Sequence, residues 1–76
     1  MNKERRARLE KASGMICDVR EIIEDVKIDE EDARDNMPEN LQASERYEQM
    51  DEAVNTLEDI ISVLEEVESQ IDELTQ

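Results

Sequence analysis

Residues 36–44, with the sequence NMPENLQAS, separate two long apolar stripes and decide the fold of this 76-residue chain. Pro38 cannot continue an α-helix, because its ring removes the backbone N–H and clashes with the preceding turn. Ser44 is a residue type that caps helix N-termini, and Glu45 follows it where a first helical turn favours an acid. The stretch therefore predicts that one helix ends and another begins here. Asn36 would cap a short helical turn between them, with Pro38 near its first position.

Apolar residues on both sides of this stretch recur at alternating spacings of three and four, the a and d pattern of coiled-coil helices. The first stripe is Leu9, Ala12, Ile16, Val19, Ile23 and Val26, and its frame continues through Glu30, Ala33 and Met37. The second is Tyr47, Met50, Val54, Leu57, Ile61 and Leu64, followed by Glu68 and Ile71. We expect an all-α, coiled-coil-like antiparallel two-helix hairpin. Residues 1–76 would form one domain, with a helix at about 3–36, a turn at about 37–44 and a helix at about 45–75.

The two stripes also predict a register. Folding the chain back near residue 40 pairs positions whose numbers add to about 80. The apolar layers would then be Leu9 with Ile71, Ile16 with Leu64, Val19 with Ile61, Ile23 with Leu57, and Val26 with Val54. The same register predicts three ion pairs along one edge, namely Arg6–Asp72, Arg20–Glu58 and Lys27–Asp51.

A second group of apolar residues lies beside these stripes, and a lone hairpin does not need it. We call this group the apolar edge; it consists of Met15, Ile22, Ile60, Val67 and Leu74. Burying five such side chains would contribute about 1.5–3 kcal/mol each, a stabilising free energy that the small core of a lone hairpin does not supply. We expect the edge to pack against a second copy, as a homodimeric four-helix bundle, or against a helix of another protein. The alternative is that long neighbouring side chains cover it.

Composition argues against catalysis. The chain has no His and one cysteine, Cys17, so it has no imidazole base and no internal disulfide. The acidic run at residues 29–35 lacks the glycine and the ligand order of a calcium loop. We therefore predict no enzymatic activity, no cofactor and no metal site. No apolar run resembles a signal peptide or a membrane span, so we expect a cytoplasmic protein that does not contact membranes.

Charge is the most unusual property of the chain. It carries 23 acidic and 9 basic residues, a net charge of −14, and five of the basic residues lie within residues 3–11. We expect a partner-binding acidic face made of Glu21, Glu24, Asp25, Glu31, Asp32, Asp35, Glu52, Asp59, Glu66 and Glu73. Such a surface repels nucleic acid, and the acidic end of the second helix would neutralise the basic segment. The acidic face could instead compete with DNA for a protein with a basic surface. The alternative is that these acids only keep the hairpin soluble.

The turn and the second helix also carry a family resemblance. Residues 35–42 (DNMPENLQ), 44–50 (SERYEQM) and 58–66 (EDIISVLEE) resemble small acidic helical-hairpin proteins of bacterial phages and mobile elements. The resemblance covers about the last two-thirds of the chain. It implies that the protein acts in the cytoplasm of a host bacterium, where small acidic phage proteins often antagonise restriction or CRISPR systems. It implies no catalytic residue.

Charge pattern and resemblance together predict a small acidic inhibitor that binds a host nucleic-acid-handling or defence protein, in the manner of a DNA mimic. The alternative function is a structural or assembly module that docks a partner helix through the apolar edge. Survival of binding in about 0.5 M salt would favour the second, because exposed charges are screened there.

Overall fold

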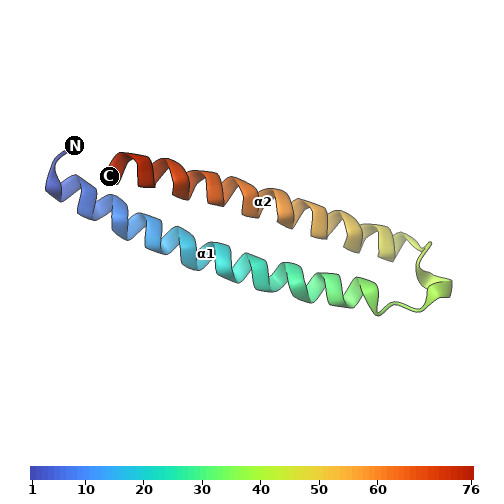
Figure 1. Cartoon of the computed structure of the whole chain (residues 1–76). Coiled ribbons are helices and arrows are strands. Elements are labelled where there is room, and N and C mark those ends of the chain that lie inside the picture. The colour runs from blue at the N-terminus through green and yellow to red at the C-terminus, as the bar shows by residue number, and fades with distance from the viewer.

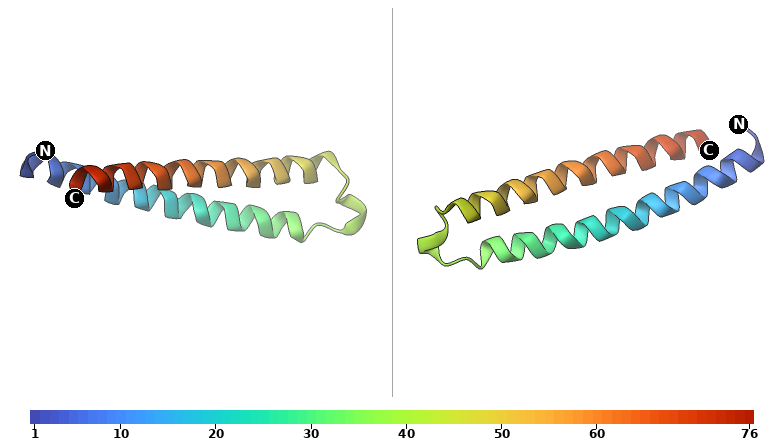
Figure 2. Two further views of the ribbon diagram at one scale, coloured as in Figure 1. Left: turned by 45° about the horizontal axis from the view of Figure 1, so that its top comes forward. Right: turned by 180° about the vertical axis from the view of Figure 1, so that it is seen from behind.

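The computed structural model describes all 76 residues, as two long helices joined by a short connection (Figure 1). Helix α1 spans Lys3–Asp35, a 3-10 turn (η1) spans Glu39–Leu41, and α2 spans Glu45–Thr75. The helices run side by side in opposite directions, so both termini lie at one end of a rod (Figure 2). The Cα atoms of this rod extend over 59 by 14 by 13 Å. The all-α helical hairpin predicted from the sequence is confirmed.

Side chains cap the start of both helices. Asn2 Oδ1 accepts a hydrogen bond from the Arg5 N–H at 2.8 Å, and Ser44 Oγ accepts one from the Tyr47 N–H at 3.3 Å. Each bond satisfies one of the backbone donors that a helix start leaves without a partner. Pro38 lies directly before η1, and the Leu41 N–H donates to its carbonyl at 2.8 Å. The connection is therefore a compact turn that contains one short 3-10 helix.

The core between the helices is thin. Only Val54 and Ile61, both on α2, are buried, with 2% and 8% of their surface exposed. The remaining members of the second predicted stripe are half-buried, so that stripe faces α1 as expected. Only two of the 76 residues are buried, and a core this small rarely supplies more than about 3–5 kcal/mol. The hairpin has little stability of its own to draw on.

The first predicted stripe is only partly correct. Ile16 and Ile23 are half-buried, but Val19, Val26 and Ala33 are exposed. In their place the interface between the two helices, which we call the seam, contains three basic residues at seven-residue spacing. These are Arg20, Lys27 and Arg34, whose side chains are 20–27% exposed. Their aliphatic stems can cover apolar surface while their heads reach acids across the seam. Each helix has one neighbour, so α2 covers only one side of the apolar face of α1. The covered side is the one next to these basic residues.

Three ion pairs between the helices establish the register. They are Arg20–Glu68 at 2.7 Å, Lys27–Glu58 at 3.6 Å and Arg34–Asp51 at 2.7 Å. The paired residue numbers add to 88, 85 and 85, and not to the predicted 80. The predicted pairs Arg6–Asp72, Arg20–Glu58 and Lys27–Asp51 are therefore wrong, and the five predicted apolar layers are displaced with them.

The register differs because the start of α2 is not level with the end of α1. Nine residues separate the helices, which lets α2 begin beyond the end of α1. A heptad pattern presents equivalent positions again after about seven residues, so apolar spacing alone cannot distinguish registers about one heptad apart. As a consequence, the first turns of α1 project beyond the C-terminal end of α2 (Figures 1 and 2).

Candidate protein-binding surfaces

Arg20 is the most extensively bonded side chain of the seam. Its Nε and Nη2 donate to the two carboxylate oxygens of Glu68 at 2.7 and 3.3 Å, and its Nη1 donates to Glu24 at 2.8 Å. The hydrogen bond to Glu68, followed by that to Glu24, raises the pKa of Arg20 above its ordinary value. The pKa of Arg34 is raised in the same way, first by its hydrogen bond to Asp35 and then by that to Asp51. Both guanidinium groups stay charged and hold the helices in register.

These contacts use some of the carboxylates that the sequence assigned to an outward acidic face. Glu24 pairs with Arg20, Glu31 with Lys27 and Asp35 with Arg34, each on α1 itself. Glu24 and Glu31 were expected on an outward face, but both are half-buried beside the seam and do not project freely into solvent. Of the ten predicted residues, the seven that form no ion pair are Glu21, Asp25, Asp32, Glu52, Asp59, Glu66 and Glu73.

Four of these seven form one row along α2. Glu52, Asp59, Glu66 and Glu73 are all exposed and recur every seven residues, which places them on the side of α2 turned away from α1. Seven residues advance about 10.5 Å along a helix, so the row spans about 31 Å. Asp25 and Asp32 lie on the outer side of α1, so the ten residues surround the rod and do not share one flat face. We call the four residues on α2 the acidic row.

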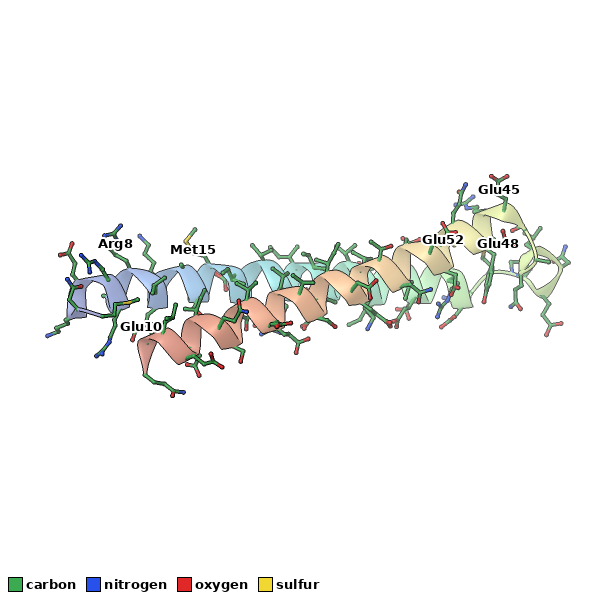
Figure 3. All side chains as sticks on the ribbon, turned by 90° about the horizontal axis from the view of Figure 1, so that it is seen from above. Arg8, Glu10, Met15, Glu45, Glu48 and Glu52 are labelled. Carbon is green, nitrogen blue, oxygen red and sulfur yellow. The ribbon has the colours of Figure 1, made fainter.

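Most of the apolar edge is exposed to solvent. Met15 and Ile22 on α1 are 61% and 63% exposed, Ile60 and Leu74 on α2 are also exposed, and Val67 is half-buried. Figure 3 shows Met15 projecting from the same side of α1 as Arg8, while Glu10 lies on the opposite side. A row of all-carbon side chains continues from Met15 along this side of the rod (Figure 3).

Three further apolar residues adjoin the edge and were not predicted as part of it, namely Val19, Val26 and Val63. On α1, residues 15, 19, 22 and 26 follow one another at spacings of four, three and four, which makes them a helical stripe in their own right. Val63 lines an open groove of about 250 Å³ with Thr56, Asp59, Ile60 and Leu64. The width of the apolar arc of α1, about 120° from Ile16 to Ile22, is the signal in the sequence that indicates more than one neighbour.

The basic segment is not neutralised, contrary to expectation. Its five basic residues, Lys3, Arg5, Arg6, Arg8 and Lys11, are all exposed, and none lies within ion-pair distance of an acid. The cause is the register, which leaves the first turns of α1 beyond the end of α2 (Figure 2). Arg5 and Arg8 line an open hollow of about 490 Å³ with Met1 and Leu9. We call these five residues the basic end.

Other chemistry is sparse. Cys17 is half-buried, and Arg20 Nη2 donates to its sulfur at 3.6 Å. No group of three or more acidic or cysteine side chains converges on a point where it could hold a metal ion. Neither helix has a stretch long and apolar enough to cross a membrane. The features that the fold presents are therefore surfaces: the acidic row, the apolar edge and the basic end.

Comparison with known proteins adds no relative to this description, because no protein-family model, no curated protein and no solved structure matches the chain.

Proposed function

We propose that this protein acts by binding another protein, and that its acidic row engages a basic surface on that partner. The observation that carries the proposal is that Glu52, Asp59, Glu66 and Glu73 are exposed, aligned and free of any ion pair. The hairpin uses other acids for its own seam and leaves this row to solvent. A rigid helix presents the four charges at fixed positions, so little ordering entropy is lost when a partner binds.

The charge density of the rod favours a partner that normally binds nucleic acid. A net charge of −14 over a length of 59 Å is one negative charge per about 4 Å, against about one per 1.7 Å in duplex DNA. The rod thus carries about two-fifths of the DNA charge density. That density is enough to steer the protein toward a basic channel and to occupy part of it. The protein would inhibit by occlusion and would perform no chemistry itself.

The resemblance to small acidic hairpin proteins of phages and mobile elements points to the class of partner. A phage-encoded protein of this kind would act in the cytoplasm of a host bacterium on a restriction or CRISPR protein. The basic surface that such a defence protein uses for DNA or RNA is the complement of the acidic row.

Capture from a bacterial lysate on the immobilised chain tests the proposal. We expect the retained proteins to include nucleic-acid-binding proteins, and we expect both added duplex DNA and about 0.5 M salt to release them. Retention that neither DNA nor salt reverses would contradict binding through the acidic row.

The alternative function, an assembly module that docks a partner helix, has one observation in its favour. The apolar edge exposes Met15 and Ile22 over more than half of their surface. A complex formed through this edge would survive high salt, because burial of apolar surface is not screened. The same salt series therefore separates the two functions.

A further inference from the structure

The apolar residues of α1 that the hairpin leaves exposed form a stripe of their own. Met15, Val19, Ile22 and Val26 lie on one side of the helix and are 47–63% exposed. This α1 stripe is centred between residues 20 and 21, and α1 as a whole, Lys3–Asp35, is centred on Val19. An identical helix laid against the stripe would therefore overlap α1 along nearly its entire length.

We propose that the α1 stripe binds the same stripe of a second copy that runs in the opposite direction. Under a two-fold axis through its centre, Met15 lies level with Val26 of the second copy, and Val19 with Ile22. A stripe that matches its own reverse is what a two-fold symmetric interface requires. Ile60, Val63, Val67 and Leu74 on α2 extend the same side of the rod, so two hairpins would form a four-helix bundle.

Charge determines the direction of the second copy. The antiparallel arrangement brings Lys11 level with Glu30 of the second copy, and brings Arg8 level with Ala33, about one helical turn from Asp29 and Glu30. None of these four charged residues makes an ion pair within the hairpin. A parallel arrangement would instead place the two basic ends together and the two acidic segments together, which is unfavourable.

Figure 3 shows the same complementarity along the rod. Arg8 and Met15 project from the same edge in the half of the rod that holds the basic end, and Glu45 projects from that edge at the turn end. Reversing one rod therefore places its basic end against the acidic turn end of the other. The occupant that fits an apolar centre with a basic end and an acidic end is another copy of this chain. This inference rests on residues outside the acidic row, so it can fail without affecting the proposed function.

Two isoleucines on α1 give a matched test of the surface. Ile22 belongs to the α1 stripe, and Ile28 is similarly exposed but lies outside it. We expect sedimentation equilibrium to show a dimer for the unmodified chain and for Ile28→Glu, and a monomer for Ile22→Glu. A monomeric unmodified chain at every concentration, or equal masses for the two variants, would overturn the proposal. Circular dichroism checks that both variants remain helical.

Charge reversal tests the direction. We expect the variant Arg8→Glu with Lys11→Glu, and the variant Asp29→Lys with Glu30→Lys, each to dimerise more weakly than the unmodified chain. An equimolar mixture should regain the affinity of the unmodified dimer, because each variant now complements the other. A mixture no tighter than either variant alone would overturn the antiparallel arrangement.

A distance measurement gives the direction independently. With Cys17→Ala and a nitroxide label on Ala7→Cys, the antiparallel dimer places the labels about 40 Å apart, because residue 7 lies level with residue 34 of the second copy. A parallel dimer places them at the same end of the bundle. A distribution dominated by short distances would contradict the proposal.

Discussion

Arg20 on α1 donates hydrogen bonds to both carboxylate oxygens of Glu68 on α2, at 2.7 and 3.3 Å. This bidentate pair establishes a register that differs from the one the apolar pattern predicts. Both side chains are about one-fifth exposed, and Glu24 holds the remaining side of the guanidinium. The pair belongs to a network, and networks resist solvent competition better than isolated surface pairs.

The first prediction concerns this register. In a double-mutant cycle, Arg20→Gln and Glu68→Gln should show a favourable coupling energy in urea unfolding, because the two side chains are in direct contact. The cycle of Arg20→Gln with Glu58→Gln is the matched control and should show none. Coupling to Glu58 in place of Glu68 would support the register in which the chain folds back near residue 40.

The second prediction concerns pH. The pKa of Arg20 is raised above its ordinary value by its hydrogen bonds to Glu68 and Glu24, so its ion pair contributes fully below that ordinary value and is lost only as pH rises through the higher pKa of the folded state. Lysine has an ordinary pKa of about 10.4. We therefore expect the Tm of Arg20→Lys to fall relative to the unmodified chain as pH increases from 8 to about 11. Parallel Tm curves for the two proteins over that range would show that the charge at residue 20 does not support the seam.

The third prediction concerns the core. Ile61→Ala should lower the free energy of unfolding by about 2 kcal/mol, near the lower limit for such changes because the core is thin. Ile28→Ala should change it by less than about 0.5 kcal/mol, since that side chain is half-exposed and outside the seam. Urea unfolding measures both. Equal effects would mean that Ile61 is not the centre of the core.

The fourth prediction concerns Gly14. It lies in the middle of α1, and a Cβ added there would meet no atom within 4 Å. Gly14→Ala should therefore raise the free energy of unfolding by about 1 kcal/mol through helix propensity alone. A decrease would indicate that the glycine permits a close contact with another chain.

Local sequence pattern determines some features of this fold and leaves others open. The heptad spacing around Val54 and Ile61, and the cap at Ser44, depend on neighbouring residues, and both appear as predicted. The register depends on how the nine residues between the helices turn, and the spacing repeats after each heptad, so the pattern could not distinguish one register from the next.

The exposed surfaces were likewise predictable only where they do not depend on the register. The exposure of Met15 and Ile22 was predictable because both lie beside the seam in either register. The unpaired state of Arg6 was not, because it results from the projection of α1 beyond α2. Val19 and Val26 were assigned to the seam because they lie near the middle of the apolar arc of α1. Only the structure shows that the seam lies to one side of that arc.

Neutralising the acidic row tests the central claim, binding to a basic protein surface, most directly. The variant with Glu52→Gln, Asp59→Asn, Glu66→Gln and Glu73→Gln removes the row. The control with Glu4→Gln, Glu10→Gln, Glu39→Gln and Glu48→Gln removes the same number of unpaired acids elsewhere. Both variants then have the same net charge. We predict that the row variant loses capture of nucleic-acid-binding proteins from a bacterial lysate, while the control keeps most of it. Equal capture by the two variants would contradict the claim that the acidic row binds the partner.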